Sequence, residues 1–115
     1  MVTTSHPEPE RSGYAPVNGL EMYYEVHGNG QPPLVLLHGA FSAIGTSFQH
    51  VLPGLAKTRQ VIAFEMQAHG RTADIDRPLT QEQLADDTTA LLRFLGIERA
   101  DLFGYSTGAA VALRV

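Results

Sequence analysis

Three short apolar runs constrain the fold of this chain more than any other feature. They occur, in chain order, at Leu34–Leu37, Gln60–Phe64 and Asp101–Tyr105. A short run that is apolar throughout is typical of a strand buried on both faces of a parallel sheet. Parallel strands need a crossover between them, and that crossover is usually a helix. The runs therefore predict an α/β fold with a mostly parallel sheet flanked by helices.

Helical patterns occupy the segments between and after these runs. The predicted helices are, in chain order, Ser47–Ala56, which Pro53 disturbs, then Thr80–Leu95 and Thr107–Val115. The second helix has the clearest signals, because Thr80 and Gln83 form a capping box and Gly96 follows its last turn. We expect its neighbouring acids, Asp86 and Asp87, to lie on a solvated helix face.

The chain before the first run predicts an antiparallel hairpin. Asn18 and Gly19 stand between apolar residues, which is the strongest short-range hairpin signal, and Leu20–Val26 then continues as an aromatic-rich strand. Residues 1–13 combine prolines and acidic residues with no apolar run. We therefore expect residues 1–13 to be a flexible leader and residues 14–115 to form one continuous structural unit.

Composition excludes several classes of function. The formal net charge is −4 and no Lys/Arg cluster is present, so the sequence predicts neither a nucleic-acid nor a membrane partner. The absence of cysteine excludes disulfides and thiolate metal sites. We find no ligand cluster for a metal and no motif for a cofactor, and we expect a cytoplasmic protein.

The stretch Gly104-Tyr105-Ser106-Thr107-Gly108 is a Gly-x-Ser-x-Gly motif between a predicted strand and a predicted helix. In that setting the sharp turn forces the serine into a strained backbone conformation, and glycines are needed where neighbouring backbones approach. The motif also occurs by chance in loops. The strand before it and the helix after it favour Ser106 as a nucleophile over an ordinary turn hydroxyl.

A second loop supports this interpretation. His38 and Gly39 follow the first apolar run, so their loop lies at the carboxyl end of the sheet, where open α/β folds bind ligands. If the two strands are neighbours, the backbone N–H groups of Ala40 and Thr107 can meet at one point and form an oxyanion hole. We expect His38 and His69 to be hydrogen-bonded packing residues of their turns rather than general bases.

These segments together resemble the α/β-hydrolase superfamily, over nearly everything from residue 17 to residue 115. The motifs that carry the resemblance are LVLLHGAF, VIAFEMQAHGRT and LFGYSTGAAVAL, in the family's order. The resemblance implies that Ser106 is the nucleophile and that Ala40 and Thr107 supply the oxyanion-hole amides. Phe41 takes the place of Ala40 if the loop bends differently, and Gly104 and Gly108 are the glycines of the nucleophile elbow.

The serine also bears on the reaction that the resemblance implies. Family members with serine include esterases, thioesterases, lactonases and carbon–carbon bond hydrolases, whereas dehalogenases and epoxide hydrolases place an aspartate there. The implied function is hydrolysis of carboxylic esters or related small acyl compounds through an acyl-enzyme intermediate, without a cofactor.

The sequence departs from the family pattern at three turn positions. Glu65 stands where the family usually has aspartate, and Ala68 and Ala109 replace glycines. Each change adds atoms where backbones usually approach closely, so a locally shifted turn is one expected consequence. None of the changes removes a group on which the reaction depends.

The rest of the triad is not in this sequence. The family's triad runs in the order serine, acid, histidine, but the nine residues after Ser106 contain neither an acid nor a histidine. We expect the chain to be the amino-terminal part of a longer hydrolase, truncated within the helix after the elbow and nearly inactive alone, because a serine without a base is a poor nucleophile. The alternative is a truncated or degenerate, non-catalytic fold that acts only in binding or assembly.

Overall fold

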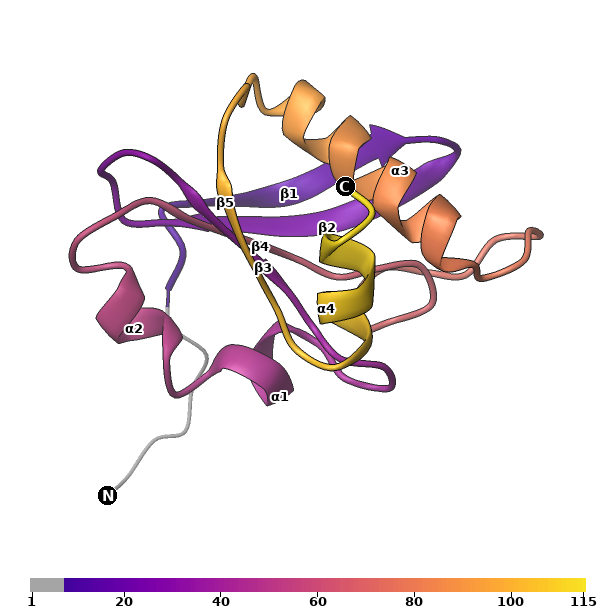
Figure 1. Ribbon diagram of the computed structural model, residues 1–115, viewed down its shortest axis with the longest axis horizontal. Coiled ribbons are helices and arrows are strands. Elements are labelled where there is room, and N and C mark those ends of the chain that lie inside the picture. Colours follow the sequence, from indigo (N-terminus) through magenta and orange to yellow (C-terminus); the bar gives the residue numbers. More distant parts are fainter. Residues whose placement is uncertain (1–7) are drawn as a thin grey trace.

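The chain forms a mixed five-stranded sheet with helices on both faces, in a computed structural model that describes residues 8–115 (Figure 1). The strands are β1 Arg11–Val17, β2 Leu20–His27, β3 Leu34–Leu37, β4 Val61–Phe64 and β5 Asp101–Gly104. The helices are α1 Ile44–Phe48, α2 Leu52–Leu55, α3 Gln81–Phe94 and α4 Thr107–Ala112.

The strand order β1-β2-β4-β3-β5 confirms the predicted α/β architecture. The three apolar runs form parallel neighbours, with β3 between β4 and β5. Leu34 lies opposite Val61 on one side and Asp101 on the other. The β1–β2 hairpin joins this parallel part antiparallel, through pairing of β2 with β4. The carboxyl ends of β3 and β5 are therefore adjacent at one edge of the sheet.

The hairpin turn forms at the predicted dipeptide. Asn18 and Gly19 have φ values of 50° and 86°, and Val17 pairs with Leu20 across them. Two successive positive φ values match the twist of the flanking strands. The same register continues to Arg11, which pairs with Val26. Residues 11–13 therefore belong to strand β1 and not to the predicted leader, which extends three residues too far. Residues 1–7 of that leader lie outside the described residues.

Alternation along the central strands divides the apolar core into two layers. Leu34 and Leu36 face the α1–α2 side, and Val35 and Leu37 face the α3–α4 side. This follows from the two-residue period of a strand, which sends successive side chains to opposite faces. Figure 1 shows α1 and α2 on one side of the sheet and α3 and α4 on the other. Both faces of β3 are thereby covered, which fixes its carboxyl end rigidly.

The helix predicted for residues 47–56 is wrong as a single element. The structure has two short helices there, and the first begins earlier, at Ile44. Pro53 lies in the first turn of α2, where its missing N–H is tolerated but where a continuous helix from α1 cannot pass. By contrast, α3 begins as predicted, with the Thr80 side chain accepting a hydrogen bond from the Gln83 N–H at 3.1 Å.

The two acids of α3 have different environments. Asp86 is exposed as expected, but Asp87 is completely buried, so the predicted solvated face is wrong for Asp87. Its carboxylate pairs with the guanidinium of Arg77. It also accepts hydrogen bonds from the amide of Asn18, at 3.0 Å, and from that of Gln83, at 3.2 Å. A buried carboxylate needs such partners, and here they join α3 to the hairpin turn and to the segment before α3.

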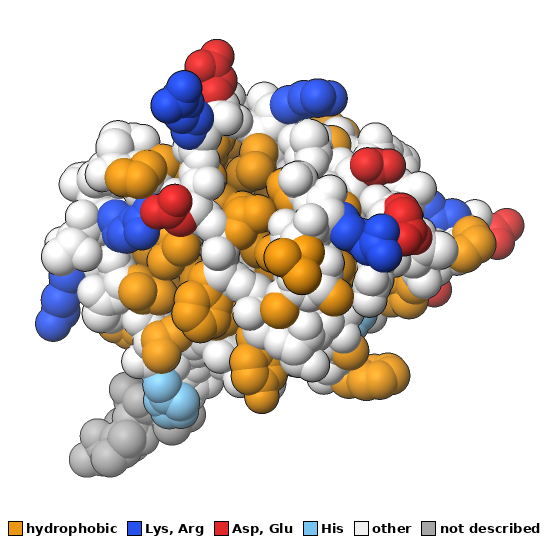
Figure 2. Space-filling model, in the orientation of Figure 1, with side chains coloured by type: hydrophobic (Ala, Val, Ile, Leu, Met, Phe, Trp, Pro, Cys, Tyr) orange, Lys and Arg blue, Asp and Glu red, His pale blue; other side chains and the backbone are white. Residues whose placement is uncertain are grey.

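Apolar side chains are exposed along β5 and α4 (Figure 2). The exposed fractions are 51% for Phe103, 61% for Tyr105 and 90% for Leu113. Among the described strands, β5 pairs only with β3, so its other edge has no strand beside it. No helix within residues 8–115 has both the length and the apolar character needed to cross a bilayer.

Candidate active site

Ser106 is the residue between strand β5 and helix α4. Its backbone has φ 57° and ψ −116°, and its side chain is exposed. A positive φ is unfavourable for a residue with a Cβ and persists only where the surrounding structure enforces it. Within residues 8–115 the Ser106 hydroxyl makes no hydrogen bond. The strand-to-helix turn thus holds a serine in a strained conformation with its hydroxyl free.

The glycines on either side of Ser106 allow a close backbone approach. A Cβ on Gly108 would overlap the carbonyl oxygens of Leu37 and His38, and one on Gly104 would overlap the backbone of Ala109. The turn is also tied to β3 by the Tyr105 N–H, which donates to the Leu37 carbonyl at 3.0 Å. These contacts press the start of α4 against the end of β3. Ala109 fits here despite replacing a glycine, because its own side chain is exposed.

The loop between β3 and α1 is held by side-chain acceptors on either side of a free segment. The Gly39 N–H donates to Ser47 Oγ at 3.3 Å, the Ala43 N–H to Thr46 Oγ1 at 2.9 Å, and the Ile44 N–H to Glu65 Oε2 at 3.1 Å. Between these tethers, the N–H groups of residues 40–42 have no acceptor in the described part of the chain. The loop is therefore fixed at its ends and keeps its central donors free.

The N–H of Thr107, the first residue of α4, is also free within residues 8–115. It belongs to the first turn of a helix, where backbone N–H groups have no partner within the helix. The structure therefore leaves free donors both after β3 and after Ser106. Because β3 and β5 are paired, these two donor segments lie at the same edge of the sheet.

Three of the four non-glycine residues with positive φ in the described chain lie at this edge, and the fourth, Asn18, lies in the hairpin turn. Phe41, Ala68 and Ser106 have φ values of 57°, 67° and 57°, and they follow β3, β4 and β5 respectively. Ala68 stands where the related pattern has glycine, so the left-handed turn is kept here at the cost of strain. Strained residues of this kind are concentrated at active sites and ligand clamps.

His38 joins the turns after β3 and β4. Its Nδ1 donates to the Gly39 carbonyl at 2.8 Å, and its Nε2 accepts from the Met66 N–H at 2.9 Å. This pattern requires a neutral ring. Burial lowers the pKa of His38, and the nearby His69 ring, with its centroid 4.8 Å away, lowers it further. His69 Nδ1 bonds to the Gln67 carbonyl at 2.8 Å. Both histidines are therefore hydrogen-bonded in their turns, as the sequence predicts.

Glu65 is a buried carboxylate that connects three segments. It accepts from the Ile44 N–H, from the Arg71 N–H at 2.8 Å and from Arg71 Nε at 2.9 Å. Burial alone would raise the pKa of Glu65, but these hydrogen bonds outweigh burial and lower it. Gly70 passes so close that a Cβ there would overlap the carboxylate. The longer acid in place of aspartate is thus accommodated, and it fixes the end of the loop after β3.

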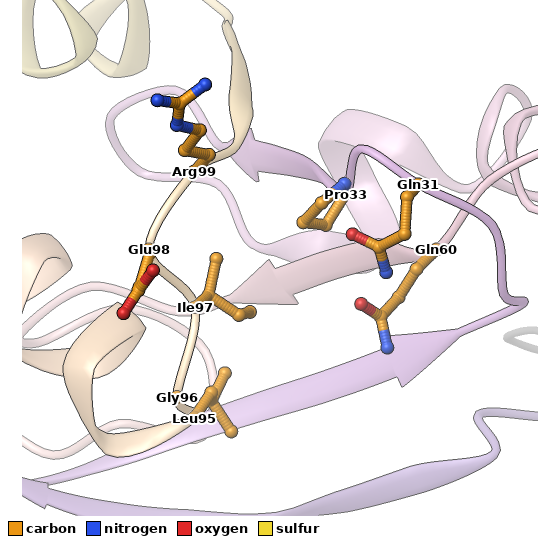
Figure 3. A pocket seen from close by; sticks show the side chains of 8 residues that line it. All are labelled: Gln31, Pro33, Gln60, Leu95, Gly96, Ile97, Glu98 and Arg99. Atoms are coloured by element: carbon orange, nitrogen blue, oxygen red, sulfur yellow. The ribbon is translucent and has the colours of Figure 1, made fainter.

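Two of the hollows in the described surface lie at opposite ends of the strands. One, of about 320 Å³, lies at the carboxyl ends and is lined by Phe41, Ser42, Ala68, His69, Gly70 and Leu79. We call it the apolar recess. The other, of about 460 Å³, is lined by segments that precede β3, β4 and β5 (Figure 3). Figure 3 shows Gln31 and Gln60 on one wall and Ile97 opposite. Of these two, the apolar recess lies at the carboxyl ends of the strands, the side of the sheet that carries Ser106 and that we call the Ser106 edge.

Comparison with known proteins supports the same fold and motif order. Residues 34–115 match the alpha/beta hydrolase family, a segment that begins at β3 and contains β4, β5 and Ser106. The chain belongs to the alpha/beta hydrolase family. Its place in that family accounts for the mixed sheet and for the turns at the carboxyl ends of the strands.

Three relatives illustrate the range of this hydrolase family. The chain is 38% identical to the dihydrolipoyllysine-residue acetyltransferase component of the acetoin cleaving system of Pseudomonas putida, over 95% of this chain and 29% of that protein. It is 34% identical to the soluble epoxide hydrolase of Corynebacterium sp. strain C12, over 85% of this chain and 34% of that protein. The structure of the enol-lactonase from Burkholderia xenovorans LB400 matches with a TM-score of 0.81 and 30% identity, over 85% of this chain and 38% of that one.

The chain therefore spans about a third of the length of these relatives. Their names describe different activities, so they establish the hydrolase family without identifying one reaction. The sequence motifs do not identify the residues that hold the loop after β3, chiefly Ser47, Thr46 and Arg71. Thr46 had a local signal, because it lies three residues after Ala43, the N-cap of α1, and bonds back to the Ala43 N–H. Ser47 and Arg71 had no comparable signal.

Proposed function

We propose that this chain carries the nucleophile and the oxyanion hole of a serine hydrolase that acts on carboxylic esters or related acyl compounds. Ser106 is the nucleophile, and the N–H groups of Ala40 and Thr107 bind the oxyanion. The observation that carries the proposal is the strained Ser106 at the β5–α4 turn, with a free hydroxyl and free donors after both β3 and β5.

The chemistry follows from these groups. Ser106 Oγ attacks the acyl carbon while its proton passes to a base, and the carbonyl oxygen becomes an oxyanion that accepts hydrogen bonds from the two N–H groups. Collapse of this intermediate breaks the bond to the leaving alcohol, which takes the proton. Water then hydrolyses the acyl-enzyme by the same steps, which releases the acid and restores Ser106.

We propose that the base comes from sequence that follows Val115 in a longer reading frame. His38 uses both ring nitrogens in the turns, and within residues 8–115 no histidine bonds to the Ser106 hydroxyl. We propose that the rest of the reading frame supplies an acid and a histidine. This agrees with the comparison, since the chain covers only about a third of the length of its relatives. Without them, the oxyanion hole alone retains on the order of 10³-fold catalysis over water.

The apolar recess indicates the kind of acyl compound. Phe41 and Leu79 form its apolar walls, and Phe41 is one residue from the Ala40 donor. An acyl substituent that extends from the oxyanion hole along this loop meets apolar surface. We therefore propose a substrate with an apolar acyl group, and no nucleic-acid or membrane partner enters the reaction.

Labelling with a fluorophosphonate tests this function. The probe phosphonylates an activated serine with loss of fluoride, so we expect strong labelling when the chain is joined to the carboxyl-terminal sequence of its reading frame. Labelling of the 115-residue chain should be weak, because no base activates Ser106. Ser106→Ala should abolish labelling, and Ser12→Ala, at an exposed position on β1, should leave it unchanged.

Equal labelling of the joined protein and of its Ser106→Ala variant would refute the assignment of Ser106 as the nucleophile. If the reading frame ends without an acid and a histidine after Ser106, the chain is a non-catalytic member of the family, and the free donors then serve binding alone.

A further inference from the structure

Three hydroxyl groups form a connected cluster beneath the loop after β3. Ser42 Oγ lies 2.6 Å from Thr46 Oγ1 and 2.6 Å from Ser47 Oγ. At its two ends the cluster accepts backbone N–H groups, from Gly39 on Ser47 and from Ala43 on Thr46. The hydroxyl cluster Ser42–Thr46–Ser47 therefore joins the two sides of the loop to the start of α1.

Ser47 is the tether next to the proposed oxyanion donor. Gly39 is buried between β3 and the Ser106 turn, where a Cβ would lie 3.1 Å from the Tyr105 ring. Its N–H, which belongs to the His38–Gly39 peptide, points to Ser47 Oγ, and this fixes the orientation of that peptide. The following Gly39–Ala40 peptide carries the Ala40 N–H, and its carbonyl accepts a hydrogen bond from His38 Nδ1 at 2.8 Å. The next N–H, that of Ala40, then has no acceptor among residues 8–115. Ser47 and His38 thus hold the two peptides that meet at Gly39, and the Ala40 donor stays available.

The remaining tethers act further along the loop. Glu65 holds Ile44, and Thr46 holds Ala43, three or four residues after Ala40. Phe41, in the left-handed conformation, lies between these points, so the middle of the loop is strained. If the Ser47 tether were lost, this strain could relax by a movement of Gly39, and His38 Nδ1 alone would then hold the peptide that presents the Ala40 donor.

We infer that Ser47 is a positioning residue for the oxyanion hole, supported by Ser42 and Thr46. The inference rests on the proposed function, since it assigns Ser47 a role in acyl transfer. A preorganised donor stabilises the oxyanion because no reorganisation is needed as charge develops. Ser47 touches no reacting atom, and its effect passes through Gly39 to the next peptide, which carries the Ala40 N–H.

The test uses the chain joined to the carboxyl-terminal sequence of its reading frame, with p-nitrophenyl butyrate as substrate. Complete loss of an oxyanion donor costs about 10²- to 10³-fold in kcat. Loss of its orienting tether in Ser47→Ala should therefore lower kcat by about tenfold and leave KM within about twofold. Ser47→Thr keeps the Oγ acceptor, and Ser47 is only partly buried, so this variant should restore kcat.

Thr89→Val is the matched control. Thr89 Oγ1 donates to the Ala85 carbonyl at 3.2 Å within α3, so its loss removes one partly buried hydroxyl away from the Ser106 edge. We expect its kcat to equal that of the unaltered protein. An unchanged kcat in Ser47→Ala would overturn the inference, as would equal effects of the alanine and threonine variants.

Amide hydrogen exchange separates this inference from the proposed function. The buried Gly39 N–H should exchange at least tenfold faster in Ser47→Ala than in the unaltered protein, whether or not the protein hydrolyses esters. Unchanged exchange at Gly39 refutes Ser47 as the tether. If exchange rises but no Ser106-dependent activity exists in any variant, the proposed function fails while the tether stands.

Discussion

At the scale of single residues, the neutral ring of His38 connects two turns at the Ser106 edge. Its Nε2 can accept from the Met66 N–H only while unprotonated. Burial lowers the pKa of His38 below its usual 6.5. The unfolded chain therefore binds a proton at a pH where the folded chain does not, so this group's contribution to stability is present above pH 6.5 and falls as the pH drops toward the lowered pKa.

We expect the free energy of unfolding to decrease as the pH falls below about 6.5, by up to about 1.4 kcal/mol per pH unit from this group. In His38→Gln the side-chain carbonyl can still accept from Met66 but cannot titrate, so that part of the slope should disappear. Urea unfolding between pH 5 and 8 measures both slopes. His50→Gln, at an exposed position, is the control and should keep the slope of the unaltered protein. Equal slopes for His38→Gln and the unaltered protein would contradict the role of His38.

At the scale of elements, α3 is fixed by a buried ion pair as well as by apolar packing. Asp87 lies three residues after Leu84 and four before Leu91, both buried, so it lies on the buried face of the helix. Its carboxylate pairs with Arg77, which also donates to Gln67 Oε1 at 2.7 Å. The pair thus holds the segment between β4 and α3 against the helix.

Asp87→Asn should lower the free energy of unfolding by about 3 kcal/mol, because it leaves the guanidinium of Arg77 partly buried without its counter-charge. Asp86→Asn changes the exposed neighbour on the same helix and should cost less than about 0.5 kcal/mol. Denaturant unfolding of both variants at pH 7 makes the comparison. Equal losses would show that Asp87 contributes no more than a surface acid.

The order and type of the elements could be predicted from the sequence, because strand and helix periodicities are local properties. The first helix could be predicted only in part. Pro53 marks the break in the sequence, but the start at Ile44 depends on Thr46 and Glu65, which bind the N–H groups of Ala43 and Ile44. The burial of Asp87 could have been predicted from the sequence, because its spacing from Leu84 and Leu91 places it on the same helix face as these two residues. The tether from Ser47 to Gly39 was out of reach, since it depends on how the loop closes onto α1.

At the scale of the whole molecule, the described sheet ends in an apolar edge. Strand β5 has no neighbour on its outer side among residues 8–115, and Phe103 and Tyr105 are more than half exposed. Figure 2 shows apolar side chains gathered on this face. Free backbone groups flanked by apolar side chains are a template for pairing with another strand. The 115-residue chain alone should therefore associate with itself through β5.

We expect the 115-residue chain to form dimers or larger species at tens of micromolar, as measured by sedimentation velocity over a concentration series. Phe103→Lys places a charge on the exposed edge and should shift the population toward monomer. Phe94→Lys is the matched control, because Phe94 is 47% exposed, close to the value for Phe103. Each of the two rings also packs edge-on against one aromatic ring. The ring centroids of Phe94 and Tyr24 are 6.3 Å apart, and those of Phe103 and Phe48 are 6.2 Å apart. It lies on α3, away from the β5 edge, and should leave the association unchanged. A monomer at every concentration, or equal effects of the two lysines, would mean that the β5 edge does not drive association.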